Sequence, residues 1–150
     1  MGIALPMFTV VIPHFNHAQT LTRALASRAE AAEWIVVDDG SDPQALAAAR
    51  SAADFAGARF ETLGVNRGPG VARNRGAELA TQPYLVFLDA DDALADGFGP
   101  AVESFLLENP EVDGLHPAVR YEGLPADLAA EFDDQRRQNS DMVTASGLVV

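Results

Sequence analysis

EWIVVDDGSDPQALAAARSAADF, residues 33–55, contains a strand followed directly by a helix. Its first part is a short apolar run rich in β-branched residues, which is typical of a buried strand. Ser41 is placed to cap a helix, Pro43 suits the first helical turn, and Gln44 completes a capping box. The segment therefore predicts a strand over 33–39 and a helix from Pro43 onward.

The same alternation continues along the chain. Strands alternating with helices of about a dozen residues indicate βαβ units and a mostly parallel sheet. Residues 122–141 mix a short helix with polar loop, and no internal repeat is present. Further strands are predicted at 7–13, 58–63, 83–89, 112–121 and 142–150, and further helices at 17–32, after 66–70, and at 98–109 with an early break at Pro100.

The composition limits the classes of function. A chain of 150 residues with 48% hydrophobic residues can form one domain with a real core. It has no cysteine, which excludes a disulfide framework, a thiolate zinc site and a cysteine nucleophile. The formal charge is −12 and all ten basic residues are Arg, so the basic stripe of a nucleic-acid binder is missing. A polyphosphate ligand would have to be met by Arg, backbone N–H groups or a metal ion.

No targeting or membrane-spanning segment is predicted. The first residues, MGIALPM, lack a basic region and are too short an apolar run for a signal peptide. No stretch approaches the roughly 20 apolar residues that a membrane span needs. The expectation is a soluble, cytoplasmic protein.

Polar residues follow three of the predicted strands at the point where each strand ends. In an open parallel sheet, ligands bind beyond the carboxyl ends of the strands, near a topological switch point. Three such ends on one edge of a sheet would build a single cleft. The segments concerned are Pro13 to Asn16 (PHFN), Asp38 to Ser41 (DDGS) and Asp89 to Asp92 (DADD).

Three carboxylates gather in LVFLDADDAL, residues 85–94, among apolar residues typical of a buried strand. Carboxylates this close resist ionising together unless a cation or hydrogen-bond donors compensate. They would serve either as turn and cap residues or as ligands of Mg²⁺ or Mn²⁺ shared with substrate phosphates. Alternation along a strand points Asp89 and Asp91 the same way, so both can address one ligand. The metal site is the favoured interpretation.

Asp38 and Asp39 have two interpretations. They would either partner the dipole of the following helix or hydrogen-bond a base or ribose, and the second role is favoured for Asp39. Other residues carry weaker signals. The histidines have no metal-binding spacing and are expected in loops or on the surface, and the single Trp is expected in the core: His14, His17, His116 and Trp34.

The segment NRGPGVARNRG, residues 66–76, suits a diphosphate. Gly68 and Gly70 precede a helix that carries Arg73 and Arg75, and both helix N-termini and Arg bind phosphate groups. The two arginines lie two residues apart and cannot share a helix face. At most one of them is therefore expected to meet the ligand.

Taken together, these segments resemble the N-terminal part of an inverting family 2 glycosyltransferase of the GT-A fold. The matching segments are FTVVIPHFNHAQTLTRAL, WIVVDDGS, NRGPGVARNRGAELA and YLVFLDADD, in the family's order and at its spacing over residues 7–92. The resemblance implies an α/β, Rossmann-like fold, with a mostly parallel sheet between helices, truncated after the donor-binding half. Residues 1–121 would form the nucleotide-diphospho-sugar-binding region, and 122–150 a partial acceptor-side segment of the same domain.

The resemblance also implies a ligand and its base-binding residues. The donor would be a nucleotide-diphospho-sugar, in first place a UDP-sugar. Pro13 and Phe15 fall where the family lines its nucleobase pocket. Phe15 stands in place of a more usual Tyr, which loses a hydroxyl and keeps the stacking face. Asp39 would bind the base, with Asp38 beside it.

The phosphate and metal residues follow from the family's DxD motif, which matches Asp89, Ala90 and Asp91. Asp89 would lie near the ribose and Asp91 would bind Mn²⁺ or Mg²⁺, with Asp92 as a second ligand. Arg73 would approach the donor diphosphate. The sequence does not reveal the sugar or the acceptor.

The catalytic base of the family is not found in this chain. Inversion needs a carboxylate on the opposite face of the sugar to deprotonate the acceptor hydroxyl. In the family this Asp often stands in an ED pair, but no ED follows Asp92, and the nearest acidic cluster is EFDDQ, residues 131–135. TASGLVV resembles the strand that precedes the base region. We expect donor and metal binding with weak or no sugar transfer, and whether the chain is an enzyme stays open.

Location and assembly are also predicted. A cytoplasmic location is expected, with a peripheral position at the inner membrane face as a further option. If the truncated fold serves as a non-catalytic module, loss of the usual cover over a sheet edge favours a homo-oligomer.

Other functions were weighed against these residues. LVFLDADDAL also resembles the nucleophile motif of haloacid-dehalogenase-type phosphatases, but those enzymes and phosphoacceptor receiver domains use a Lys, which the chain lacks. A dinucleotide site needs its glycines after the first strand, and that strand ends in PHFN. The main alternative is a non-catalytic nucleotide-sugar-binding or interaction module, and a haloacid-dehalogenase-type phosphatase is a less favoured one.

Overall fold

The computed structural model describes residues 8–27, 33–113, 118–120 and 146–149. The chain divides into two compact units, Met1–Leu94 and Ala95–Val150, which are described separately. The predicted boundary at residue 121 stays a prediction.

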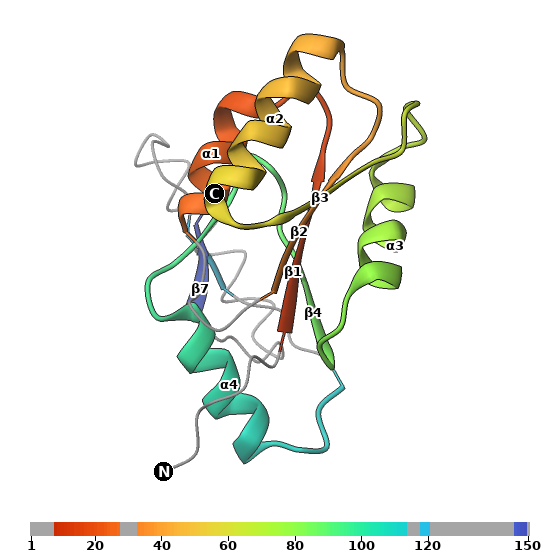
Figure 1. The fold of residues 1–150 in the computed structure, drawn as a ribbon. Helices are drawn as coiled ribbons and strands as arrows, with labels where there is room; N and C mark the ends of the chain where they lie inside the picture. Colours follow the sequence, from red (N-terminus) through yellow and green to blue (C-terminus); the bar gives the residue numbers. More distant parts are fainter. Residues whose placement is uncertain (1–7, 28–32, 114–117, 121–145, 150) are drawn as a thin grey trace, which may run out of the picture. The chain divides into compact units, whose positions relative to one another are not determined.

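The first unit is built on a four-stranded parallel sheet. Its strand order is β3-β2-β1-β4, and each neighbouring pair runs parallel. Most of the inner strands is buried because both faces of the sheet are covered. The predicted parallel α/β fold is confirmed (Figure 1). The strands are β1 (Phe8–His14), β2 (Glu33–Asp38), β3 (Arg59–Thr62) and β4 (Tyr84–Phe87).

Helices lie on both faces of this sheet, as predicted. Figure 1 shows α1 (Ala18–Ala26) and α2 (Pro43–Ala56) together on one side and α3 (Pro69–Leu79) on the other. The contact of α3 with the sheet is very close, because a Cβ atom at Gly76 would overlap Val11 of β1. The sequence GAEL thus lets α3 lie directly on the central strand.

The start of α2 differs from the prediction. Asp42, not Ser41, caps the helix, and its carboxylate accepts a hydrogen bond from the N–H of Ala45 at 2.9 Å. Ser41 is used elsewhere, since its Oγ accepts a hydrogen bond from the N–H of Asn16 at 2.9 Å. Pro43 takes the first helical position as expected.

The strand order creates a topological switch point. From β1 the chain moves outward to β2 and β3, and β4 then lies on the other side of β1. The loops that follow β1 and β4 therefore diverge, which leaves a crevice at the carboxyl ends of these two strands. The predicted strand over 83–89 is shorter in the structure and ends at Phe87.

The second unit has fewer described residues. It contains α4 (Phe98–Glu108) and two parallel strands, β6 (Ala118–Arg120) and β7 (Ser146–Val149). The predicted break at Pro100 is wrong, because Pro100 lies in the first turn, where its missing N–H would have had no helical partner. The short strand β5 (Ala93–Leu94) contains the last two residues of the first unit. The predicted polar segment 122–141 lies outside the described residues.

Among the described residues, no helix combines the length and apolar character needed to cross a bilayer.

Candidate functional site

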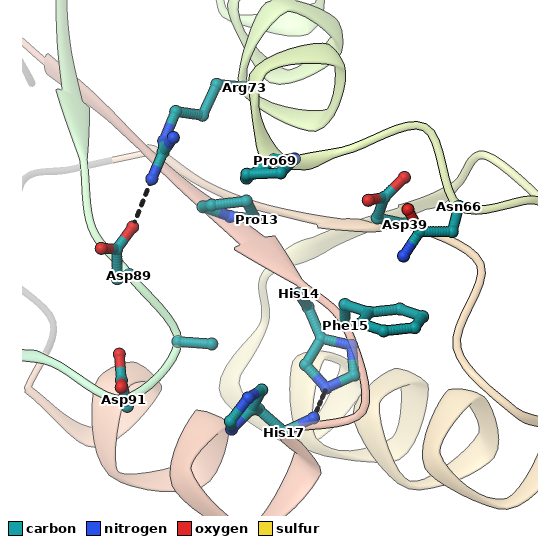
Figure 2. Close-up of a pocket in the computed structure, with 11 residues that line it drawn as sticks. Pro13, His14, Phe15, His17, Asp39, Asn66, Pro69, Arg73, Asp89 and Asp91 are labelled. Atoms are coloured by element: carbon teal, nitrogen blue, oxygen red, sulfur yellow. Dashed lines mark hydrogen bonds and ion pairs between the residues drawn. The ribbon is translucent and has the colours of Figure 1, made fainter.

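A pocket of about 360 Å³ lies at the switch point of the first unit, within the size range of small-molecule sites. It is formed at the carboxyl ends of β1, β2 and β4 and by the start of α3 (Figure 2). The predicted meeting of three polar strand ends therefore occurs. The lining residues are Pro13, His14, Phe15, His17, Asp39, Asn66, Pro69, Arg73, Asp89, Ala90 and Asp91.

The pocket has two chemically different ends. Figure 2 shows Phe15, Asp39 and Asn66 at one end, and Arg73, Asp89 and Asp91 at the other. The first end offers an exposed aromatic ring beside hydrogen-bonding groups. The second offers carboxylates and one guanidinium. Of the residues predicted from the sequence, all line the pocket except Asp38 and Asp92.

Asp39 has a second contact besides the pocket. Its Oδ1 accepts a hydrogen bond from the N–H of Arg67 at 2.7 Å, and its Oδ2 accepts one from the N–H of Gly68 at 2.9 Å. These bonds hold the loop between β3 and α3. Each carboxylate oxygen has a further lone pair, so Asp39 can still accept a hydrogen bond from a ligand.

The structure gives Asp38 a different position from the one expected beside the base. Its side chain is fully buried and does not line the pocket. It accepts hydrogen bonds from His14 Nδ1, the N–H groups of Gly40 and Ser41, and Thr62 Oγ1. Burial alone would raise its pKa, but the hydrogen bonds, led by those from Ser41 and His14, outweigh burial and hold the pKa of Asp38 below its ordinary value. Asp38 is thus an internal hydrogen-bond acceptor.

The expected loop or surface location of His14 is wrong. His14 is only 1% exposed, because its ring is held between Asp38 and the backbone N–H of His17. His17 does lie at the pocket, as an exposed residue. His116 lies outside the described residues, and Trp34 is in the core as expected.

The two arginines of α3 separate as their spacing predicts. Arg73 reaches the pocket, where its Nη2 lies 2.6 Å from Asp89 Oδ1. Arg75 turns to Glu61 on β3 and Glu78 on α3, at 2.7 and 3.2 Å. Only Arg73 is therefore available to a ligand in the pocket.

A turn positions the aspartates at the acidic end of the pocket, whereas the sequence predicted that strand alternation would do so. Since β4 ends at Phe87, Asp89 to Asp92 form a turn in which the N–H of Asp92 donates to the carbonyl of Asp89 at 3.0 Å. Asp89 and Asp91 nevertheless both face the pocket. Asp92 is buried behind them, and burial, followed by the charges of Asp91 and Asp89, raises its pKa to about 6.

This cluster fits a hard cation. Among the residues that the structure describes, no three His, Cys, Asp or Glu side chains are placed to hold a metal ion by themselves. Mg²⁺ and similar ions are commonly bound by one or two carboxylates together with substrate phosphates. Positive charge is already present, since Arg73 pairs with Asp89 and Arg23 lowers the pKa of Asp92, but burial and the charges of Asp91 and Asp89 outweigh the effect of Arg23. Asp89 and Asp91, which both line the pocket, therefore suit a hard cation that a phosphate ligand completes.

Four lining residues were missed by sequence reasoning: His14, His17, Asn66 and Pro69. Asn66 and Pro69 belong to the NRGPG segment, whose glycines and arginines alone were considered. Pro69 begins α3, and a proline at the first helical position is a recognisable signal. His17 carries no such signal, because its place depends on how the loop after β1 turns.

A parallel sheet with helices on both faces and a polar pocket at its switch point defines an open α/β protein with a ligand site in the position expected for this class. The chain belongs to glycosyl transferase family 2, whose family model matches residues 9–145. Its fold is the GT-A fold of solved glycosyltransferases.

Two curated relatives illustrate the similarity. The succinoglycan biosynthesis protein ExoU of Rhizobium meliloti is 41% identical over 95 residues, which cover 59% of this chain and 27% of the relative. A PGL/p-HBAD biosynthesis glycosyltransferase of Mycobacterium bovis is 38% identical over 123 residues, covering 78% of this chain and 48% of the relative. The chain therefore spans less than half the length of these relatives.

Solved structures have the same fold. S. aureus TarS 1–349 in complex with UDP-GlcNAc matches with a TM-score of 0.68 and 25% identity, covering 79% of this chain and 36% of that one. The mannosyltransferase PcManGT from Pyrobaculum calidifontis, in complex with GDP-Man and Mn²⁺, matches with a TM-score of 0.66 and 26% identity over 77% of this chain and 36% of that one.

Proposed function

We propose that this chain binds a nucleotide-diphospho-sugar with Mn²⁺ or Mg²⁺ and forms the donor-binding part of an inverting glycosyltransferase. The observation that carries the proposal is the two-ended pocket, in which an exposed aromatic ring and Asp39 lie opposite Arg73 and the aspartates. The complexes of TarS with UDP-GlcNAc and of PcManGT with GDP-Man and Mn²⁺ support it.

The nucleobase occupies the end formed by Pro13, Phe15 and Asp39. Phe15 is 42% exposed, so its ring face is free to stack on a base. Asp39 accepts a hydrogen bond from a ring N–H of the base, which favours uracil or guanine over cytosine because only the first two carry such a proton. A UDP-sugar is the first candidate donor.

The diphosphate and the cation occupy the other end. Asp91 would hold the cation together with Asp89, and Asp92 would be a further ligand. When bound, the cation supplies Lewis-acid stabilisation of the charge that develops on the leaving diphosphate. On ligand binding, Arg73 releases Asp89 and pairs with a diphosphate oxygen instead. The position of Arg73 in the first half of α3 and its ion pair with Asp89 at the pocket support this role.

Sugar transfer by the 150-residue chain is expected to be weak or absent. Transfer with inversion requires a carboxylate base opposite the leaving group, and the sequence has no ED pair after Asp92. The nearest acidic cluster, residues 131–135, lies outside the described residues. Measurable sugar transfer to any acceptor hydroxyl by this chain would contradict the expectation.

Calorimetric titration of UDP, and then of GDP, with and without Mn²⁺ tests the proposal. We expect UDP to bind with Mn²⁺ and to lose most of its affinity when EDTA removes the metal, because the aspartates and the diphosphate then repel each other. If neither nucleotide binds under any metal condition, the chain retains the family's fold without its donor site. Binding without transfer would favour the alternative of a non-catalytic nucleotide-sugar-binding module.

A homo-oligomer remains the predicted assembly. In the four-stranded sheet, β4 is an edge strand, and its Leu85 and Phe87 are 41% and 47% exposed. Exposed apolar edge strands favour association with another chain. Light scattering is expected to give a mass above that of the monomer, and a monomer at every concentration would contradict this. A cytoplasmic location at the inner membrane face likewise stays a prediction.

A further inference from the structure

His14, the last residue of β1, is a buried residue to which the proposed function gives no role. Its Nδ1 lies 2.9 Å from Asp38 Oδ1, and its Nε2 lies 3.1 Å from the backbone N of His17. Both ring nitrogens therefore have partners in different segments, since Asp38 ends β2 and His17 lies in the loop after β1. A buried histidine used only to fill space would not need two such contacts.

The contacts determine where the imidazole carries its proton. A backbone N–H can only donate, so Nε2 must accept the hydrogen bond from His17 with its lone pair. The proton of the neutral ring then lies on Nδ1, where the carboxylate of Asp38 accepts it. The ring thus donates from Nδ1 to Asp38 and accepts at Nε2 from His17.

Asp38 extends this connection to two further strand ends. Its Oδ2 accepts hydrogen bonds from the N–H of Ser41 at 3.1 Å and from Thr62 Oγ1, at the end of β3, at 3.2 Å. The backbone N–H of Asp39 donates to the carbonyl of His14 at 2.8 Å. The loops after β1 and β2 and the end of β3 therefore meet at one imidazole–carboxylate pair.

The loop after β1 has further support. Asn16 has a φ of 56°, a left-handed conformation that Asn tolerates better than other residues with a Cβ atom, because its short polar side chain can form local hydrogen bonds. Its N–H donates to Ser41 Oγ, and its Oδ1 accepts from the N–H of Asp42, each at 2.9 Å. With the bond from His17 to His14, these contacts fix the turn that presents Phe15 to the pocket.

We infer that His14 is a positioning residue of the donor site, because its ring ties together the loops that carry Phe15 and Asp39. The inference rests on the proposed function only for the identity of the ligand. Pro13 and Phe15 are its neighbours in sequence, and Asp39 follows its partner Asp38. Displacement of either loop separates the stacking ring from the carboxylate that would accept the base N–H.

Three substitutions separate the two contacts. His14→Asn retains a donor near the place of Nδ1 and loses the bond to His17. His14→Gln places a carbonyl oxygen near Nε2 and loses the bond to Asp38. His14→Leu removes both. Ile12→Val is the matched control, since Ile12 is a fully buried residue of the same strand without a contact to the pocket and its truncation lowers stability modestly.

Titration of UDP with Mn²⁺, at a temperature where each variant is folded, measures the effect. We expect His14→Asn and His14→Gln each to weaken the affinity for UDP about three- to tenfold, which is the range that one lost hydrogen bond produces. His14→Leu is expected to weaken it more than either, and Ile12→Val to leave the affinity unchanged. Wild-type affinity in folded His14→Leu, with only a lower Tm, would overturn the inference and leave His14 a structural residue.

Amide hydrogen exchange tests the connection without any ligand. In His14→Leu, exchange is expected to accelerate together at residues 15–17, 39–41 and 63–68, with the rest of β1 unchanged. Acceleration confined to 15–17 would overturn the role of His14 as the link between loops. This measurement also separates the two ideas, because a wild-type chain that binds no nucleotide refutes the proposed function while the exchange result still decides the role of His14.

Discussion

Replacing Asp91 by Asn is expected to remove the Mn²⁺-dependent part of UDP binding, weakening the affinity by about two orders of magnitude. Asp91 faces the pocket, whereas the ion pair with Arg73 is made by Asp89. Its substitution therefore removes a ligand of the cation without releasing the arginine. Asn retains the shape of the side chain, so the turn formed by Asp89 to Asp92 is expected to persist.

Two titrations check this expectation. In the first, UDP is titrated into Asp91→Asn with Mn²⁺ and with EDTA, and both should give the weak affinity that the wild-type chain shows in EDTA. In the second, Asp54→Asn serves as the control, since it makes the same change of charge at an exposed position on α2, far from the pocket in sequence and structure. An unchanged dependence on Mn²⁺ in Asp91→Asn would refute the role of Asp91 as a metal ligand.

Replacing Gly40 by Ala is expected to produce the largest loss of stability near the site. Gly40 has a φ of +77°, and a Cβ atom there would overlap the backbone of Val65 and Asn66. The left-handed conformation costs about 1–2 kcal/mol for Ala, and overpacking adds about 1–3 kcal/mol. The free energy of unfolding should therefore fall by about 2–5 kcal/mol.

Gly64→Ala is the matched control for this loss. Gly64 has nearly the same φ, +76°, but no atom lies within 4 Å of the place where its Cβ would be. Urea denaturation should therefore show a loss of only about 1–2 kcal/mol for Gly64→Ala. Equal losses of unfolding free energy in the two variants would mean that the backbone at Val65 and Asn66 moves aside without a measurable cost, which would contradict the prediction. Since Asp39 holds the same loop through Arg67 and Gly68, Gly40→Ala should also weaken UDP.

The repeating pattern of the sequence was sufficient to predict the sheet of the first unit. Buried β-branched runs such as WIVV and helical spacings between them are local signals, and the parallel arrangement follows from their alternation. The gathering of Phe15, Asp39, Arg73 and Asp91 in one pocket was also predictable, because ligand sites of parallel sheets form at strand ends.

The roles of Asp38 and His14 were not predictable from the same signals. Both are polar residues at strand ends, where polar side chains usually face solvent or ligand. Their burial depends on a contact across 24 positions of sequence, which no local pattern contains. The cap of α2 was missed for a related reason, since Ser41 and Asp42 are both good capping residues and the choice depends on Asn16, which binds the Oγ of Ser41.

All of the pocket residues fall between Pro13 and Asp91, inside the first compact unit. A genetic exchange of the segment after residue 94 would therefore leave every residue that lines the pocket in place. The residues that line the pocket are inherited together, whichever sequence follows them.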